Sequence, residues 1–158
     1  MRIRFAKNED AAAIARLRRS TILHINSKDY PEDVIEAWSA RTNANSFKNH
    51  ADNLKRWVAV ENNKIIGFVE HDSKAELTRL YVHKNFQGKG VGSRLLCRAE
   101  ESMKKLGHKK ISLESTISAK PFYEAKGYKV IKKGFHTLQG KKALIYFMSK
   151  KIDKNYPA

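Results

Sequence analysis

The chain has 158 residues, 41% of them hydrophobic and 30% charged, which is enough for one domain over residues 1–158 and requires no second. The absence of any 18-residue apolar run excludes a membrane-spanning helix, and the single cysteine, Cys97, excludes an internal disulfide. Because no apolar signal-peptide stretch follows Met1–Arg4 either, the sequence predicts a cytoplasmic protein. Thirty-two Lys and Arg residues against sixteen Asp and Glu give a net charge of +16, which favours anionic ligands or partners.

The N-terminal third predicts one strand and two helices. Residues 2–6 alternate between polar and apolar side chains, as a strand does. A polar Asn-Glu-Asp stretch then provides capping residues for a helix over Ala11–Ile25. Pro31 stands in the first turn of a second helix that runs to about Ala40. Residues 42–53 are polar and predict a loop or a short helix.

The middle of the chain predicts a run of strands followed by a long helix. Three short apolar runs separated by polar turns, 57–60, 65–69 and 77–82, predict consecutive antiparallel strands. A helical pattern follows the glycine-rich stretch after the third run and ends near Leu106. Residues 111–115 alternate as a fifth strand, and because a helix separates it from 77–82, the two strands should be parallel.

The last third predicts a short helix and two further strands. The helix passes through Phe122–Ala125 and ends at Gly127. The strands are expected at 128–132 and 143–148, with a turn near Gln139–Gly140. The predicted fold is therefore α/β, a mixed sheet of about seven strands flanked by about four helices.

A phosphate site is predicted where the third apolar run meets the long helix. The connecting sequence is Gln87-Gly88-Lys89-Gly90-Val91-Gly92. A glycine-rich turn between a strand and a helix leaves the first amides of the helix pointing at one spot, where the helix dipole also favours an anion. The glycines allow positive φ and close approach of a ligand. Neither a Walker A loop nor a Rossmann fingerprint is present.

Two segments resemble the GNAT superfamily of N-acetyltransferases. Gln-x-x-Gly-x-Gly after a Leu-Tyr-Val strand is similar to the acyl-CoA loop of that family. Ala119-x-x-Phe122-Tyr123-Glu124-x-x-Gly127-Tyr128 is similar to the segment that closes the cofactor site. The sequence over 115–123, taken with Tyr30 and Trp38, looks most like a bacterial subgroup of these acetyltransferases. The resemblance covers roughly residues 57–130 and implies a GNAT fold and acetyl-CoA as co-substrate, with no metal.

The resemblance also implies a set of cofactor-binding residues. Thr116 stands beside the expected pantetheine arm, at a position where the family usually has an asparagine. Backbone contacts to pantetheine are expected from the strand, and the diphosphate is expected on the loop and the helix start. The expected residues are Leu80, Tyr81 and Val82 for pantetheine, and Gln87, Gly88, Lys89, Gly90, Val91, Gly92 and Ser93 for the diphosphate.

Acetyl transfer to an amine requires a base and an acid. An alkyl ammonium has a pKa near ~10 and must lose a proton before it attacks, while the departing thiolate needs a proton. Glu76 is the first candidate for the base: it lies eleven residues before Gln87, as in the family, and about 20 Å of strand separates it from Val82. Its strand parity predicts that it faces the same side as Leu80 and Val82. Glu114, in the middle of the fifth strand, is the rival.

Tyr123 is expected to be the acid, since the resemblance assigns it to that motif position. Tyr30, Trp38 and the loop 42–53 are candidates for the acceptor pocket. Of the histidines, His83 lies closest to the glycine-rich stretch in sequence, and His136 lies beyond the sixth predicted strand. Neither has a metal-ligand spacing to another His or Cys, so both are expected at the surface. Cys97 is expected to be a packing or surface thiol rather than a nucleophile.

Three functions remain open at this point. The first is an N-acetyltransferase acting on a primary amine of a small molecule or a protein, and the second is a non-catalytic acyl-CoA-binding module. The third is a basic nucleic-acid-associated protein, which is disfavoured because the lysine pairs are spread along the chain without a recognised nucleic-acid module. The positive field disfavours polyamines and favours an acidic or neutral amine, unless the pocket is locally negative. A homodimer through the last strands is compatible with related folds.

Overall fold

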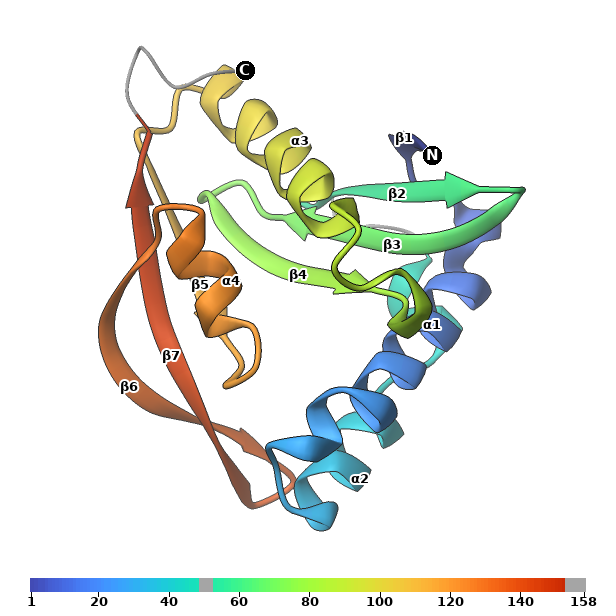
Figure 1. Cartoon of the computed structure of the whole chain (residues 1–158), viewed down its shortest axis with the longest axis vertical. Helices are drawn as coiled ribbons and strands as arrows, with labels where there is room; N and C mark the ends of the chain where they lie inside the picture. Colours follow the sequence, from blue (N-terminus) through green and yellow to red (C-terminus); the bar gives the residue numbers. More distant parts are fainter. Residues whose placement is uncertain (49–52, 153–158) are drawn as a thin grey trace.

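A computed structural model describes residues 1–48 and 53–152 of the chain. It contains a seven-stranded mixed sheet with the order β1-β2-β3-β4-β5-β7-β6 (Figure 1). The strands are β1 (Arg2–Phe5), β2 (Lys55–Glu61), β3 (Lys64–His71), β4 (Glu76–Val82), β5 (Lys110–Ser115), β6 (Lys129–Leu138) and β7 (Lys141–Lys151). Within the described residues the α-helices are α1 (Ala11–His24), α2 (Glu32–Ala40), α3 (Val91–Lys105) and α4 (Lys120–Ala125). The predicted α/β class, strand number and helix number are confirmed.

The N-terminal half of the sheet is an antiparallel meander. β2 pairs with β3 and β3 with β4, both antiparallel, as the three apolar runs predicted. β1 adds to the meander by pairing antiparallel with β2. The polar stretch 42–53 contains a short 3-10 helix, Ala44–Phe47, whose Phe47 side chain is fully buried. Residues 49–52 of that stretch lie outside the described residues.

β4 and β5 are parallel, as expected for strands connected through a helix, but they pair over only a short stretch. Their paired residues are Glu76 with Ser112 and Leu77 with Leu113. Beyond these pairs the strands diverge, and α4 follows the end of β5 on the same face as α3 (Figure 1). The sheet is therefore open at its centre, between the C-terminal half of β4 and the end of β5.

β4 carries a β-bulge at Thr78. In the pairing with β3, Arg79 opposes Glu70 and Leu77 opposes His71, so Thr78 is one residue extra. A bulge of this kind shifts the alternation of side chains by one position. Leu77, Leu80 and Val82 contact the core cluster under α3, whereas Tyr81 packs on the opposite face.

The bulge corrects the prediction made for Glu76. Strand parity placed Glu76 on the same side as Leu80 and Val82, and this is wrong. Because Thr78 interrupts the alternation, Glu76 shares a face with Arg79 and Tyr81 instead.

Helices cover both faces of the meander. α3 packs against β2, β3 and β4 on one face, and α1 packs against β3 and β4 on the other. Gly67 of β3 allows α3 to approach closely, since a Cβ there would lie 2.9 Å from Leu95 Cδ1 and 3.0 Å from the Tyr81 carbonyl oxygen. The start of α3 is thereby fixed over the end of β4, which positions the glycine-rich loop.

β6 and β7 form a hairpin that is longer than predicted. The turn at Gln139–Gly140 is confirmed, with φ of 50° and 79°. The strands extend over ten and eleven residues, beyond the expected 128–132 and 143–148. β6 is the outer strand of the sheet and is exposed along most of its length. An exposed edge strand does not need apolar alternation, so no pattern over residues 133–138 predicted a strand there.

No helix within the described residues is long and apolar enough to cross a membrane.

Candidate active site

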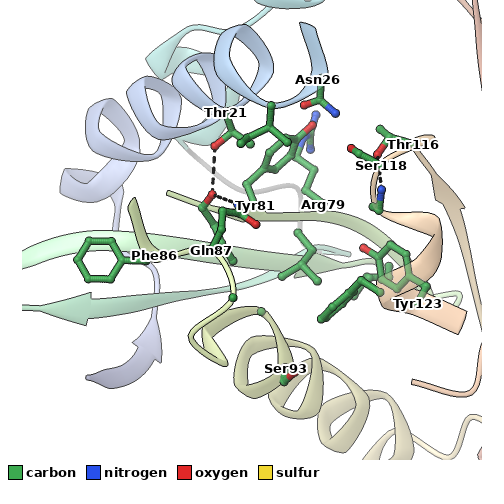
Figure 2. Close-up of a pocket in the computed structure, with 18 of the residues that line it drawn as sticks. Thr21, Asn26, Arg79, Tyr81, Phe86, Gln87, Ser93, Thr116, Ser118 and Tyr123 are labelled. Atoms are coloured by element: carbon green, nitrogen blue, oxygen red, sulfur yellow. Dashed lines mark hydrogen bonds between the residues drawn. The ribbon is translucent and has the colours of Figure 1, made fainter. Parts of the chain in front are cut away.

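A cavity of about 450 Å³ lies where β4 and β5 diverge, under the starts of α3 and α4 (Figure 2). The end of α1, the C-terminal half of β4, the glycine-rich loop, the end of β5 and the start of α4 contribute its walls. The predicted site residues Leu80, Tyr81, Val82, Gln87, Gly88, Gly90, Gly92, Ser93, Glu114, Thr116 and Tyr123 line this cavity.

The glycine-rich loop has the backbone conformation that the sequence predicted. Gly88 and Gly90 have φ of 72° and 84°, in the left-handed region, and Gly90 is the N-cap of α3. The first helical hydrogen bond runs from the Arg94 amide to the Gly90 carbonyl, so the amides of residues 91–93 are not used inside the helix. The first turn, residues 91–94, carries no carboxylate. Positive potential from the helix dipole is therefore available to an anion in the cavity.

Two residues of the predicted diphosphate set lie outside the cavity wall. The Val91 side chain is buried in the core, so only its backbone faces the loop. The Lys89 ammonium lies over the Phe86 ring, 5.4 Å from its centroid, and Lys89 does not line the cavity.

The edge of β4 presents its backbone to the cavity. The Val82 carbonyl accepts hydrogen bonds from Gln87 Nε2 at 2.6 Å and Thr21 Oγ1 at 3.4 Å (Figure 2). Since alternate residues of an antiparallel strand point their backbone groups to the same edge, Leu80 also faces the cavity. The Tyr81 carbonyl instead lies beside Gly67 of β3. Of the three expected backbone partners, Leu80 and Val82 are therefore placed at the open edge.

Tyr123 points from α4 into the cavity (Figure 2). Its side chain is only 6% exposed and packs edge-on against Phe122 and Tyr128. Burial, together with the nearby Tyr81, raises the pKa of the Tyr123 hydroxyl well above its usual range. The hydroxyl therefore carries its proton at neutral pH and can donate it. Thr116, also in the wall, accepts a hydrogen bond from the Ala119 amide at 3.3 Å and so supports the start of α4.

A second cavity, of about 360 Å³, opens on the other face of the sheet. Arg18 of α1, Trp38 of α2, Leu54 and the β6–β7 hairpin residues His136 and Ile145 contribute to its walls. It shares with the first cavity the residues Leu77, Thr78, Arg79, Tyr81, Glu114 and Thr116. The two cavities therefore meet where β4 and β5 part, one on each face of the sheet.

Both candidate bases lie at this junction. Glu76 lines the second cavity and Glu114 lines both. Burial, and the negative charges of Asp72 and Glu114, raise the pKa of Glu76 above its usual range. Glu114 Oε2 lies 3.7 Å from His136 Nδ1. His136 is exposed at the surface, as expected, and the long β6–β7 hairpin places it in the wall of the second cavity.

Only one of the two aromatic residues predicted for the acceptor pocket lines a cavity. Trp38 lines the second cavity, whereas Tyr30 lines neither. The Tyr30 hydroxyl donates to the Leu144 carbonyl at 2.6 Å and accepts from the Ile117 amide at 3.1 Å, and the ring packs edge-on against Trp38. Tyr30 is thus placed to join α2 to β7 and to the segment before α4.

A buried charged cluster, not predicted from the sequence, lies in the wall of the second cavity. The Glu70 side chain is fully buried, its Oε1 accepts from Thr78 Oγ1 and Arg79 Nη1, both at 2.7 Å, and its Oε2 accepts from Arg56 Nε at 2.8 Å. Burial alone would raise the pKa of Glu70, but the charges of Arg79 and Arg56 outweigh it and hold the pKa below its usual range. The position of Arg56 and Glu70 on paired strands of one hairpin was the available signal.

Replacing Glu70 by glutamine is expected to destabilise the fold by about 3–5 kcal/mol, because two guanidinium groups lose their shared carboxylate, one of them fully buried. Equilibrium urea unfolding measures the difference. Because the pKa of Glu70 is lowered in the folded state, the difference in free energy of unfolding between wild type and variant is largest at neutral pH. It becomes smaller as the pH falls below the ordinary Glu pKa of about 4.3. The control is Glu61→Gln, which removes a partly exposed ion pair on β2 and should change stability by about 1 kcal/mol or less. Equal effects of the two variants would contradict the role assigned to the cluster.

Cys97 and His83 have structural contacts and no indicated catalytic role. Cys97 lies on α3, its thiol donates to Glu101 at 3.7 Å, and burial raises its pKa, which disfavours a thiolate. His83 caps the short turn before the glycine-rich loop through its ring nitrogen. In the described part of the chain, no group of three or more His, Cys, Asp or Glu side chains is arranged so that it could hold a metal ion.

Comparison with known proteins places these features in a family. Residues 26–139 match the family model described as the acetyltransferase (GNAT) domain. The uncharacterised N-acetyltransferase YafP of Escherichia coli (strain K12) is 30% identical over 108 residues, which cover 67% of this chain and 66% of that protein, just under two thirds of its length.

Solved structures share the fold over nearly the whole chain. A GCN5-related N-acetyltransferase from Rhodopseudomonas palustris superposes with a TM-score of 0.90 at 23% identity, covering 96% of this chain and 95% of the other. The PaiA N-acetyltransferase of Thermoplasma acidophilum, in complex with coenzyme A, superposes with a TM-score of 0.73 at 25% identity, covering 96% and 100%.

Proposed function

Because the chain belongs to the GNAT acetyltransferase family, we propose that it transfers the acetyl group of acetyl-CoA to a primary amine. The observation that carries the proposal is the meeting of two cavities at the divergence of β4 and β5. One cavity has an anion-binding helix start, and the other has carboxylates able to accept a proton. Each substrate would thus occupy its own cavity, and the two substrates would come together where the cavities share their lining residues.

The residues of the first cavity fit a long diphosphate ligand. No described atom lies within 4 Å of where a Cβ would stand at Gly88 or Gly90, so the loop leaves space above its amides. The amides of residues 91–93 would hold the diphosphate, and the β4 edge at Leu80 and Val82 would bond the pantetheine amides. The relative from Thermoplasma acidophilum was solved with coenzyme A, which supports this assignment. Acetyl-CoA supplies the activated acetyl thioester.

The protein's own groups supply the proton transfers. Glu76 takes the proton from the acceptor ammonium, since burial and the charges of Asp72 and Glu114 raise the pKa of this carboxyl and so make its carboxylate a stronger base. Tyr123 holds a proton on the cofactor side of the junction and donates it to the leaving sulfur. Glu114, beside His136, raises the pKa of Glu76 and lines the passage between the cavities.

A thiol-release assay tests the proposal. Purified protein is mixed with acetyl-CoA and a panel of primary amines, and free thiol is measured against time. Release that depends on both protein and amine is expected. Binding of coenzyme A without thiol release for any amine would favour a non-catalytic acyl-CoA-binding module instead.

A further inference from the structure

Asn26 is a buried polar residue in the wall of the first cavity, and the proton transfers proposed above do not use it. It begins the short 3-10 helix Asn26–Lys28 that follows α1, and it is only 5% exposed. Figure 2 shows its carboxamide directed towards β4, on the same side of the cavity as Thr21 of α1. A polar side chain is thus held inside the cavity rather than at the outer surface.

The hydrogen-bonding groups of this side chain are not used by the protein. Within residues 1–48 and 53–152, the Asn26 carboxamide makes no hydrogen bond to another residue. The other carboxamide of the described cavity wall, Gln87, already donates to the Val82 carbonyl at 2.6 Å. A buried carboxamide without a partner costs free energy, and an apolar side chain of similar size would not. A ligand that offers both a donor and an acceptor at this place is therefore favoured.

The backbone that carries Asn26 is held in place on both sides. Before it, the Ile25 amide donates to the Thr21 carbonyl at 2.8 Å. After it, the Asp29 amide donates to the Asn26 carbonyl at 3.0 Å. The buried Tyr30 follows, and its hydroxyl joins the segment to β7 and to the segment before α4. The carboxamide is therefore presented by a fixed backbone, as a pre-organised binding group requires.

Asn26 lies beside the middle of the cavity rather than at the glycine-rich loop. Thr21 Oγ1 lies 3.4 Å from the Val82 carbonyl oxygen, at the loop end of β4. Asn26 follows five residues later, roughly 7 Å further along at 1.5 Å per helical residue. Figure 2 shows it beyond Thr21 in the direction of Thr116, away from Gln87. It therefore faces the space between the β4 edge and the start of α4.

We infer that the Asn26 carboxamide binds an amide of the pantetheine arm, from the side of the cavity formed by the end of α1. The arm is a chain with two secondary amides, and a carboxamide can donate to the carbonyl of such an amide and accept from its N–H. Asn26 does not line the second cavity, so the acceptor amine is not its partner. This inference rests on the proposed function and adds a positioning residue to its cofactor site.

Calorimetric titration with coenzyme A tests the inference. Asn26→Leu and Asn26→Ala should each raise the Kd for coenzyme A about 5- to 30-fold, the effect of losing two neutral hydrogen bonds. Because alanine is smaller than asparagine, a loss in both variants is not a steric block. Adenosine diphosphate, which has the diphosphate without the pantetheine arm, should bind the wild type and both variants alike. An unchanged Kd for coenzyme A in both variants, or equal losses for the two ligands, would overturn the inference.

Thermal unfolding without ligand separates a binding role from a structural one. Asn26→Leu removes no hydrogen bond to another described residue, so it should melt at the wild-type temperature or above. Ser27→Ala is the control, since Ser27 is exposed in the same 3-10 helix, lines neither cavity and donates to the Leu23 carbonyl. It should keep the wild-type Kd for coenzyme A. A lower melting temperature of Asn26→Leu with an unchanged Kd would show that Asn26 serves the fold, and would overturn the inference.

The thiol-release assay separates this inference from the proposed function. Both Asn26 variants should raise the KM for acetyl-CoA and leave the KM for the amine unchanged. A rise in the KM for the amine alone would assign Asn26 to the acceptor, which overturns the inference and leaves the acetyltransferase proposal standing. Weaker coenzyme A binding by the variants of a protein that releases no thiol overturns the proposed function and supports the assignment of Asn26. No binding of coenzyme A by the wild type overturns both.

Discussion

Replacing Tyr123 by phenylalanine is expected to slow thiol release by about 10²- to 10⁴-fold, the usual contribution of a positioned general acid. The variant removes one hydroxyl from an α4 side chain whose ring packs against Phe122 and Tyr128, so the ring should stay in place. Coenzyme A affinity should remain nearly intact, because the expected diphosphate and pantetheine contacts come from α3 and β4. The measurements are kcat from the thiol-release assay and Kd from calorimetry.

Tyr146→Phe is the matched control for this variant. Tyr146 lies on β7, lines neither cavity and loses the same atom. It should retain wild-type turnover. If Tyr123→Phe turned over as fast as Tyr146→Phe, Tyr123 would have no part in the proton transfer.

Replacing Glu76 by glutamine is expected to lower kcat by about 10²- to 10⁴-fold at neutral pH, because the acceptor then lacks its base. In the wild type, the raised pKa of Glu76 means that the carboxylate is protonated at low pH, and activity appears as pH rises through that pKa. The acid limb of the kcat/KM profile should therefore lie above the usual range of a glutamate. The measurement is the pH profile of thiol release.

Glu114→Gln distinguishes the two candidate bases. Glu114 is one of the charges that raise the pKa of Glu76, so its removal should move the acid limb to lower pH while catalysis persists. If Glu114→Gln abolished turnover and Glu76→Gln retained it, Glu114 would be the base.

The glycine-rich loop could be predicted because its physics is local. Positive φ at Gly88 and Gly90 and the free amides at the start of α3 follow from a strand, a turn and a helix that are adjacent in sequence. The same locality explains why the three apolar runs gave a correct meander. The motif resemblance then added Tyr123, whose burial no periodicity would show.

Much of the second cavity could not be predicted from the sequence, because its contacts are between distant residues. The bulge at Thr78 exists only in the pairing of β4 with β3, and it moved Glu76 to the other face. Arg18 donates a hydrogen bond to Thr42, which is 24 residues away in the sequence. His136 lies beside Glu114 because β6 continues to Leu138, beyond the predicted strand 128–132. Such juxtapositions depend on packing rather than on any pattern in the chain.

We propose that the amides at the start of α3 hold the diphosphate of an acyl-CoA. Calorimetric titration of the folded protein with coenzyme A, and separately with pantetheine, which has the thiol arm without the diphosphate, tests it most directly. We predict saturable one-to-one binding of coenzyme A and no measurable binding of pantetheine at the same concentrations. Equal binding of both ligands, or binding of neither, would contradict the claim.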